Sequence, residues 1–444
     1  MFDLVIAGAG PAGAIAATLL HRGGFQVALV SPHIPHAAPS LKEHARIEGM
    51  SERVFKILSE LDLPTEGVFP ARQRSIYWGG LESRVNREHL VDRTVFDQAL
   101  QEKARSTGVS LVSGLVRTIT KDQNELLLDD GSILKAGLVV EARGRRAPSR
   151  TNSLRSHPTL AICGFTAPSM KETAQAASIS ALPSGWLWQA SEPGLGTWSQ
   201  LVVDATSLPP GQEGLESVWR ETLAAASSAA PTGPPEFPKD PVVRSCELRL
   251  TTPELDPQLL TIGDAAIAID PLSGHGLFWA ISSALMCPVL ARAVLDRETG
   301  LAKTFYRNRV QETFWRQARV GRDFYQLAHE EMKSVFWSNR ASWPDTKPSH
   351  ANIEKPAIKQ QVIVRDGKLK KADTLLSALD PNGVAFIEGH ELIPILKRLG
   401  KGPMPNPADF HAQILPDTDR ATAEHVHAWI AHRKQAGGLP DTLL

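Results

Sequence analysis

The chain has 444 residues, which is enough for two or three domains and a large core. Its 48 Lys and Arg residues balance its 48 Asp and Glu residues, so no net charge recruits nucleic acid or a membrane surface. The three cysteines are widely spaced and form no CxxC pair, which argues against a disulfide framework or a zinc site and is typical of a reducing compartment.

The first informative stretch is LVIAGAGPAG, residues 4–13. A short apolar run leads into Gly8, Gly10 and Gly13 and then into an Ala-rich run, which indicates strand, tight turn and helix. Dinucleotide binding requires this order. Gly8 permits the turn, Gly10 lets a pyrophosphate approach the backbone, and Gly13 lets the helix pack against the strand.

A second strand is predicted at residues 25–30. It ends at Ser31 instead of the acidic residue that usually binds the ribose, so we expect a weaker adenosine anchor through the Ser31 hydroxyl. A loop is predicted over residues 32–43, and Arg46 lies just before an apolar helical period that begins behind Ser51, a plausible N-cap.

The middle of the chain alternates between helix and strand signals. A helix is predicted at residues 96–104, directly after Arg93. Strands are predicted at residues 109–112, 116–120, 125–128 and 137–141. Residues 160–203 are predicted to form a second sheet around SGWLWQ, in which Trp186 and Trp188 face the same side.

The second informative stretch is TIGDAAIAIDPLSGHG, residues 261–276. A strand ending at Gly263 and Asp264 places a carboxylate at the edge of a sheet, where it can accept hydrogen bonds from a polyol chain. The glycine-rich turn that follows opens a helix at residues 277–295, and its backbone amides can approach a flat ring. Pro288 predicts a kink or break in that helix.

The last third of the chain is predicted to be helical at first and then to form a separate unit. A helical run covers residues 301–337, and residues 338–355 are a polar, proline-containing linker. Residues 356–444 form a small domain for which a winged-helix-like form is one candidate. Within it we expect a hairpin at residues 361–371 and helices at 372–379, 389–399 and 422–435.

Several of these motifs together resemble a known family. GAGPAG, Arg46 before a helix, the run RTVFD from Arg93, VVEARGRR, and GDAA followed by DPLSGHG occur in this order in FAD-dependent monooxygenases of the p-hydroxybenzoate hydroxylase and flavin-dependent halogenase superfamily. The resemblance covers residues 1–335. In length and in the appended C-terminal domain, the chain looks most like the flavoprotein monooxygenases that mature tryptophylquinone cofactors.

The resemblance implies FAD as cofactor and a set of residues that bind it. The residues that match the family's pyrophosphate, ribitol and isoalloxazine contacts, together with their neighbours in the same motifs, are Gly8, Gly10, Pro11, Ala12, Gly13, Ser31, Arg46, Arg93, Gly263, Asp264, Pro271, Gly274, His275 and Gly276. No metal is expected, because the histidines show no ligand spacing.

Two departures from the family pattern matter. Ser31 replaces the ribose-binding glutamate, and Arg143-Gly144 replaces an Asp-Gly pair linked to FAD and NAD(P)H handling, which argues against a dedicated NADPH site. The WLW of residues 186–188 partly matches the WxW of tryptophan halogenases, but Gln189 and the residues after it differ from that signature. Trp186 and Trp188 are therefore candidate substrate contacts, and an ordinary aromatic pair on a strand is the alternative.

The expected fold class is α/β + β. A discontinuous Rossmann-like FAD-binding domain takes in residues 1–71, 90–157 and 244–337, and residues 72–89 and 158–243 form an inserted substrate-side β-sheet domain. The small C-terminal domain is expected to be α+β. It is a candidate for docking a partner, and supporting the flavin domain or forming a dimer are its alternatives.

The resemblance implies hydroxylation of an electron-rich aromatic ring through a flavin C4a-hydroperoxide, with a tryptophan in a partner polypeptide as one candidate substrate. A halogenase or reductase acting on a small molecule is one alternative. A non-enzymatic flavoprotein or partner-docking module is another. His275 is the one ionisable side chain that the sequence places beside the ring, where it could donate a proton; a backbone-bonding role is its alternative.

Targeting and membrane segments are not expected. No segment has the continuous apolar length of a membrane span, and the N-terminal apolar run is the first strand of the fold instead of a signal peptide. We therefore expect a cytoplasmic protein.

Overall fold

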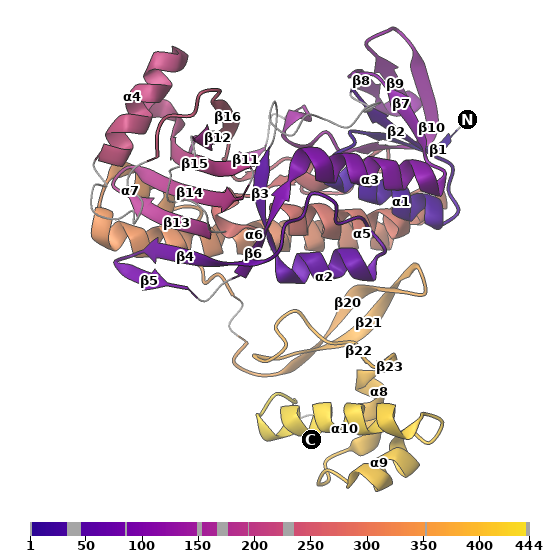
Figure 1. Ribbon diagram of the computed structural model, residues 1–444. Coiled ribbons are helices and arrows are strands. Elements are labelled where there is room, and N and C mark those ends of the chain that lie inside the picture. Colours follow the sequence, from indigo (N-terminus) through magenta and orange to yellow (C-terminus); the bar gives the residue numbers. More distant parts are fainter. Residues whose placement is uncertain are drawn as a thin grey trace. The chain divides into compact units, whose positions relative to one another are not determined.

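The computed structural model divides into two compact units, Met1–Lys347 and Pro348–Leu444, here called unit 1 and unit 2 (Figure 1). The structure describes residues 2–32, 46–84, 87–148, 153–166, 176–193, 195–224, 235–350 and 353–440. Most of the predicted loop at 32–43 lies outside these residues. The mixed α/β fold with large sheets is confirmed, whereas the functional division into domains stays a prediction.

The opening strand, β1 (Phe2–Ala7), lies at the centre of a seven-stranded sheet, here called the first sheet. Its residues Leu4–Ala7 are completely buried. The spatial order of the strands in this sheet is β7 (Ser110–Ser113), β2 (Val27–Ser31), β1, β10 (Ile133–Glu141), β9 (Glu125–Leu128) and β8 (Val116–Thr120), and β18 (Leu259–Thr261) pairs with β10. Val5 and Ala7 pack in a core cluster with residues of β8, β9 and β10. All six strands predicted for this region are confirmed.

Helix α1 (Pro11–Arg22) contacts both α3 (Arg93–Thr107) and α5 (Gly276–Leu295) beside the first sheet (Figure 1). The break predicted at Pro288 is wrong, because α5 continues through it. Proline removes one backbone hydrogen bond, but the helix is buried on several sides, and this packing outweighs the local preference.

A second sheet contains nine strands and is largely antiparallel. Its order is β16 (Val242–Ser245), β12 (Thr159–Thr166), β15 (Gly196–Asp204), β14 (Gly185–Glu192), β13 (Ala176–Leu182), β4 (Arg72–Trp78), β6 (Arg87–Asp92) and β3 (Ile47–Ser51), with β5 (Leu81–Ser83) paired to β4. The sequence analysis predicted no strand at residues 47–51, where the structure has β3. The Ser51 N-cap of α2 (Glu52–Glu60) is confirmed, since its side chain accepts the Val54 N–H.

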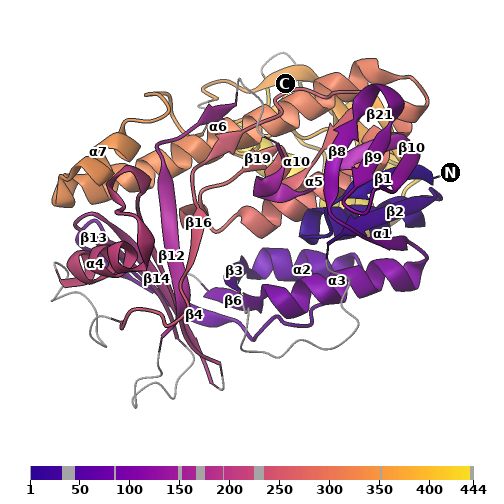
Figure 2. The same cartoon turned by 90° about the horizontal axis from the view of Figure 1, so that it is seen from above.

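The two faces of the second sheet are covered by different helices. Trp219 and Leu223 of α4 (Gly211–Ala224) pack on one face. The long helix α6 (Thr299–Met332) and the short α7 (Val335–Ala341) pack on the other, and α6 also contacts α5 beside the first sheet (Figure 2). Because α6 reaches both sheets, it links them.

The predicted linker at 338–355 is wrong in its first residues. Residues 338–341 belong to α7, and Arg340 is buried. Its Nη2 donates to Thr159 Oγ1 at 2.7 Å, and its Nη1 pairs with Asp204 at 3.2 Å. These contacts fix α7 to the second sheet, and the boundary between the two units falls later, after Lys347.

The small elements of unit 1 complete the region between the sheets. A three-stranded sheet contains β11 (Leu154–Arg155), β17 (Arg249–Leu250) and β19 (Ile267–Ala268). Single turns of 3₁₀ helix occur at η1 (Lys121–Gln123), η2 (Gly144–Arg146), η3 (Ala205–Ser207), η4 (Gly263–Ala265) and η5 (Pro271–Ser273). The three cysteines are buried and free.

Unit 2 has a core of its own, formed by aliphatic side chains and Phe410. Its elements are β20 (Ala357–Arg365), β21 (Lys368–Leu376), β22 (Phe386–Ile387), β23 (His390–Glu391), α8 (Leu392–Leu399), α9 (Pro407–Ile414) and α10 (Arg420–Gln435). The predicted helix at 372–379 is wrong, because these residues pair with β20 as far as Leu376. Helix α9 was missed, and the winged-helix-like form stays a prediction.

Helix α5 is long and apolar enough to cross a membrane by length and composition alone, contrary to the expectation that no segment is. In the most apolar 18-residue window of this helix, 61% is buried inside the protein, as expected for a core helix.

Candidate active site

The glycine turn after β1 has the geometry that a dinucleotide requires. Gly8 has a φ of +107°, and a Cβ on Gly13 would lie 1.9 Å from the Gly8 carbonyl oxygen, so neither position accommodates a side chain. A Cβ on Gly10 would meet no atom within 4 Å. No side chain caps α1 at Gly10 and no acidic residue lies in its first turn, so its N-terminal amides are suited to an anion.

The structure brings the two distant glycine-containing stretches together. Strands β1, β2, β10 and β18 run in parallel, so their carboxyl ends share one edge of the first sheet. A Cβ on Gly263 would lie 2.7 Å from the Ala12 Cβ, which shows that η4 packs directly on the start of α1. Ser31, buried at the end of β2, lies at the same edge.

Two side chains of helix α5 form hydrogen bonds with the backbone of Gly263. The Trp279 indole N–H donates to the Gly263 carbonyl oxygen at 3.0 Å, and the Ser283 hydroxyl accepts the Gly263 N–H at 2.9 Å. Asp264 lies beside Arg145, with 3.5 Å between Oδ2 and Nε. Burial raises the pKa of Asp264, and the Arg145 charge opposes this rise.

The loop predicted to contact the flat ring is fixed at one end by Asp270. Its Oδ1 accepts the Leu272 N–H at 2.9 Å, and its Oδ2 accepts the Tyr325 hydroxyl at 2.8 Å. Beyond η5, Gly274 has a φ of +64°, and Cβ atoms on Gly274 and Gly276 would meet nothing within 4 Å. The loop that begins at Pro271 therefore has a fixed base and an open backbone surface.

The predicted pyrophosphate ligand Arg46 lies in an ion-pair network with Glu48 and Arg93. Arg46 Nη2 lies 2.9 Å from Glu48 Oε1, and Arg93 Nη1 lies 2.7 Å from Glu48 Oε2. Arg93 is buried and also binds both carboxylate oxygens of Asp97. Burial alone would raise the pKa of Glu48, but the charges of Arg93 and Arg46 outweigh it and lower the pKa to about 2.

This network gives the two arginines different environments. The Arg93 side chain is enclosed by two carboxylates, whereas the Arg46 side chain is 38% exposed. Arg46 is therefore available to an anion, and Arg93 supports it through Glu48. A direct contact between Arg93 and a cofactor stays a prediction.

Trp186 and Trp188 face the same side of β14, as predicted, and both belong to one aromatic cluster. The cluster also contains Trp198, Tyr325 and Trp337. It contacts Leu272, which lies in the loop at residues 271–276, here called the cofactor loop. Trp188 donates its indole N–H to Glu88 Oε1 at 3.2 Å, whereas the buried indole nitrogen of Trp198 has no hydrogen-bond partner among the described residues. The face of the second sheet that carries these rings thus adjoins the loop.

His275 is exposed and immediately precedes α5. Its ring lies edge-on to Phe278, and Arg316 and Gln317 of α6 face it. Partial desolvation and, to a lesser degree, the Arg316 charge lower the pKa of the His275 imidazole. Leu272 of the loop contacts the aromatic cluster, and a proton-donating role for His275 stays a prediction.

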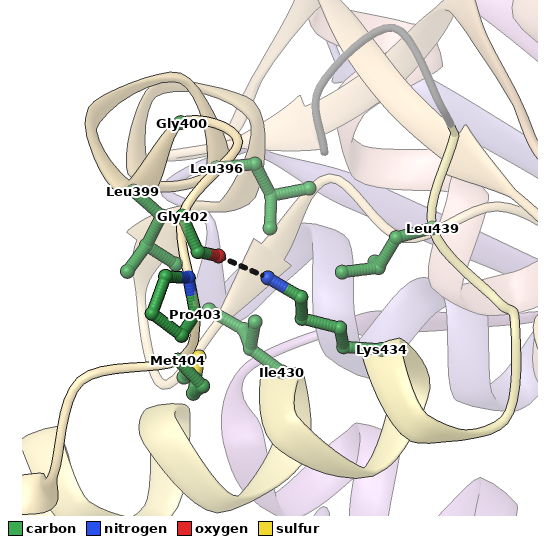
Figure 3. Close-up of a pocket in the computed structure, with 9 residues that line it drawn as sticks. All are labelled: Leu396, Leu399, Gly400, Gly402, Pro403, Met404, Ile430, Lys434 and Leu439. Carbon is green, nitrogen blue, oxygen red and sulfur yellow. Dashed lines mark hydrogen bonds between the residues drawn. The ribbon is translucent and has the colours of Figure 1, made fainter.

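A small cavity in unit 2 offers no competing site. It holds about 10 Å³, little more than a single water requires, and its wall is mainly apolar (Figure 3). The Lys434 ammonium donates to the Gly402 carbonyl oxygen at 2.6 Å across it. Within the described residues, no three potential metal-binding side chains gather in one place.

Sequence reasoning missed four residues that support the site: Glu88, Trp279, Ser283 and Tyr325. Trp279 and Ser283 carry a partial signal, because they follow the glycine turn at helical spacing. Tyr325 and Glu88 carry none, since their partners lie 55 and 100 residues away in sequence.

Comparison with known proteins places this geometry among flavoenzymes. Residues 3–162 match the model of the lycopene cyclase protein family. The chain is 24% identical over 444 aligned residues to a tryptophan 2-halogenase of Chondromyces crocatus, with 86% of this chain and 80% of the relative covered. The crystal structure of the flavin-dependent halogenase CmlS has 18% identity and a TM-score of 0.69 and covers 99% of this chain and 95% of its own.

The fold and the glycine turns define an FAD-dependent oxidoreductase of the monooxygenase and halogenase superfamily. One solved structure, that of the peptidyl tryptophan dihydroxylase QhpG, covers 97% of this chain and 98% of its own, with 32% identity and a TM-score of 0.75. The chain therefore belongs to the family of QhpG-like flavoproteins. It is an enzyme whose cofactor is FAD.

Proposed function

We propose that this protein hydroxylates an electron-rich aromatic ring and that its substrate is a tryptophan in a partner polypeptide. The similarity to QhpG over nearly all of both chains carries the proposal, since that protein is described as a peptidyl tryptophan dihydroxylase essential for tryptophylquinone cofactor biogenesis. The tryptophan-rich face of the second sheet next to Leu272 supports an aromatic substrate.

The residues at the edge of the first sheet suit each part of FAD. We assign the pyrophosphate to the Gly8–Gly13 turn, the first amides of α1 and Arg46, and the ribitol hydroxyls to Asp264. Ser31 is positioned for the ribose, and the open backbone from Gly274 to Gly276 for the ring. Bound FAD, once reduced and exposed to dioxygen, supplies an electrophilic oxygen.

Residues of the chain itself hold the loop in position and exclude water from the site. Asp270 and Tyr325 keep the base of the loop in place, and the aromatic cluster excludes water from the adjoining sheet face. His275 is the proposed proton donor. Because its pKa lies below the ordinary value, it would be protonated mainly below neutral pH.

We further propose that residues 356–444 take part in docking the partner polypeptide. The similarity to QhpG covers 97% of this chain and so includes most of these residues, and the peptidyl substrate of that protein supports the proposal.

The purified holoenzyme tests this function directly. Its flavin is reduced under nitrogen, oxygen is admitted with a tryptophan-containing peptide, and the product is identified by mass spectrometry. A gain of oxygen on the tryptophan is the expected result. A peptide that stays unchanged while peroxide accumulates, for both single-tryptophan peptides and larger polypeptides, would contradict it.

Halogenation is the second candidate, because a tryptophan 2-halogenase is among the relatives. The same reaction with added chloride or bromide separates the two functions. A halogen on the product would favour this candidate, and oxygen alone would exclude it under these conditions.

A further inference from the structure

The buried carboxylate of Glu88 hydrogen-bonds to a tryptophan of the second sheet, and no sequence pattern predicts this contact. Glu88 lies on β6 and is 6% exposed. Its Oε1 accepts the Trp188 indole N–H at 3.2 Å, and its Oε2 accepts Arg74 Nη1 at 3.2 Å. Both carboxylate oxygens are thus occupied by donors from two other strands, β14 and β4.

Gly49 on β3 provides the space for this carboxylate. A Cβ at position 49 would lie 2.8 Å from Glu88 Oε2 and 3.8 Å from the Trp188 ring. Gly49 has no positive φ, so the backbone itself accepts another residue here. The absence of a side chain is needed for Glu88 to reach Trp188, and not for the conformation of β3.

This arrangement lies on the side of the sheet that faces the cofactor site. Ile47, two residues before Gly49, belongs to the same aromatic cluster as Trp188 and directly follows Arg46. Leu272 of the cofactor loop contacts that cluster. The Trp188 ring is therefore part of the wall between the second sheet and the loop.

The three cluster tryptophans of the second sheet differ in how their rings are held. The indole nitrogen of Trp198 is buried with no hydrogen-bond partner among the described residues, and Trp186 interacts with the neutral Tyr325 hydroxyl. Trp188 is anchored by a charge-assisted hydrogen bond, which is stronger and more directional than a neutral one. A single fixed ring in an otherwise apolar wall is what orientation of a flat substrate requires.

We propose that Glu88 is a positioning residue that fixes the Trp188 indole as an oriented wall of the aromatic substrate site, with Gly49 providing its space. The inference rests on the proposed function in assigning an aromatic substrate. It goes further in naming the residue that controls how this substrate is held.

Burial raises the pKa of Glu88, while Arg74 and the Trp188 N–H stabilise its ionised form. A buried ion pair such as Glu88 and Arg74 can often be replaced as a pair by apolar residues at little cost, so stability alone does not require it. The two directed hydrogen bonds of Glu88 instead tie β6 to β14, the strand that carries Trp188, and to β4.

The test measures the binding of N-acetyl-tryptophanamide and of a single-tryptophan peptide to the FAD-loaded enzyme by the change in flavin absorbance. Glu88→Leu removes the acceptor and Trp188→Phe removes the donor. Each substitution is expected to weaken binding of the probes about tenfold, because the Trp188 ring loses the charge-assisted hydrogen bond that orients it. The double variant should bind no more weakly than either single variant, because both remove the same contact.

Three further variants make the result specific. Glu88→Gln keeps an acceptor oxygen for Trp188 and should retain binding within about threefold of the unaltered enzyme. Gly49→Ala should displace the flexible end of Glu88 and weaken binding without removing any charge. Trp219→Phe is the matched control, since its buried indole donates to the Pro235 carbonyl oxygen on the other face of the second sheet, and binding of the probes should not change.

Thermal unfolding and flavin content of each variant show whether the protein still folds and retains FAD. Glu88→Leu and Trp188→Phe variants that bind the probes as tightly as Trp219→Phe would overturn the inference, as would effects that multiply in the double variant. Failure of an unaltered enzyme to bind either probe would also overturn it. Altered binding without oxygen in any product would instead contradict the proposed hydroxylation alone.

Discussion

At the scale of single residues, the glycines of the first turn have different roles, one in packing and one in ligand binding. Gly13 faces the Gly8 carbonyl oxygen and serves the contact between helix and strand, whereas Gly10 faces open space and serves the approach of a ligand. The same amino acid is therefore required for stability at one position and for binding at the other.

Two substitutions check this separation. Gly13→Ala places a Cβ against backbone and should lower the free energy of unfolding by about 2 kcal/mol or more. Gly10→Ala should leave the unfolding of the apoprotein unchanged and weaken FAD binding at least about tenfold, because the added methyl group meets the pyrophosphate. Chemical denaturation and flavin titration measure the two effects, and equal stability losses in both variants would refute the distinction.

Glu48 makes the fold sensitive to acid. The charges of Arg93 and Arg46 lower its pKa from 4.5 to about 2 despite its burial. A lowered carboxylate pKa stabilises the protein above the unfolded value of 4.5, and this stabilisation disappears as the pH falls toward 2.

We therefore expect Glu48→Gln to lower the free energy of unfolding by about 1–2 kcal/mol at neutral pH, an amount reduced because the Glu48 side chain is 32% exposed. The difference from the unaltered protein should shrink toward zero near pH 2 (about the folded pKa). Urea unfolding at a series of pH values measures it. A difference that stays constant across this range would show that the charge is not the cause.

At the scale of elements, α6 sets the position of the cofactor loop. Its Tyr325 donates to Asp270 at the base of the loop, while Tyr306, further toward its N-terminus, donates to the Thr261 carbonyl oxygen at 2.9 Å. One helix thus contacts both the end of β18 and the loop nine residues later.

Tyr325→Phe should leave the buried Asp270 carboxylate short of one donor. We expect a stability loss of about 1–3 kcal/mol together with weaker FAD binding, because the loop loses its fixed base. Trp337→Phe is the matched control, since it removes a donor to the Leu182 carbonyl oxygen in the same aromatic cluster but away from the loop. Thermal unfolding and flavin titration of both variants provide the comparison, and an equal change in FAD affinity would contradict this account.

The elements differ in how far the sequence predicts them. The first strand, turn and helix were predictable because their signals are local: an apolar run, then Gly8, Gly10 and Gly13, then helix-forming residues. Asp264 could be assigned for the same reason. The hairpin strand through Leu376 was mistaken for a helix because pairing with β20, and not local preference, decides its conformation.

Contacts between distant segments could not be predicted. Glu88 meets Trp188 only because β3, β6, β4, β13 and β14 associate in one particular order, and a single sequence does not specify that order. Arg93 was chosen as a cofactor ligand from its motif, but its place between Glu48 and Asp97 depends on the register of β3 with β6. The mixed α/β fold was thus predictable, as was the meeting of the two glycine-containing stretches, and the contact between Glu88 and Trp188 was not.

At the scale of the whole molecule, the two units have separate cores. A protein that ends at Lys347 should therefore fold and retain FAD. If residues 356–444 dock the partner polypeptide, this shortened protein should hydroxylate N-acetyl-tryptophanamide at a rate within a fewfold of the full chain and lose at least about tenfold on a polypeptide substrate. Flavin content and product mass spectra measure both, and equal rates on the polypeptide would refute the docking role.

The link that α6 makes between the two sheets has a consequence for divergence within this family. In the proposed assignment, residues of the first sheet and the loop hold the cofactor, whereas the aromatic wall comes from strands of the second sheet, whose cluster contacts Leu272. Mutations in those strands can alter which molecules are accepted while the redox centre keeps its place. New substrates should therefore arise among such enzymes mainly by exchange of residues in β4, β6 and β12–β16.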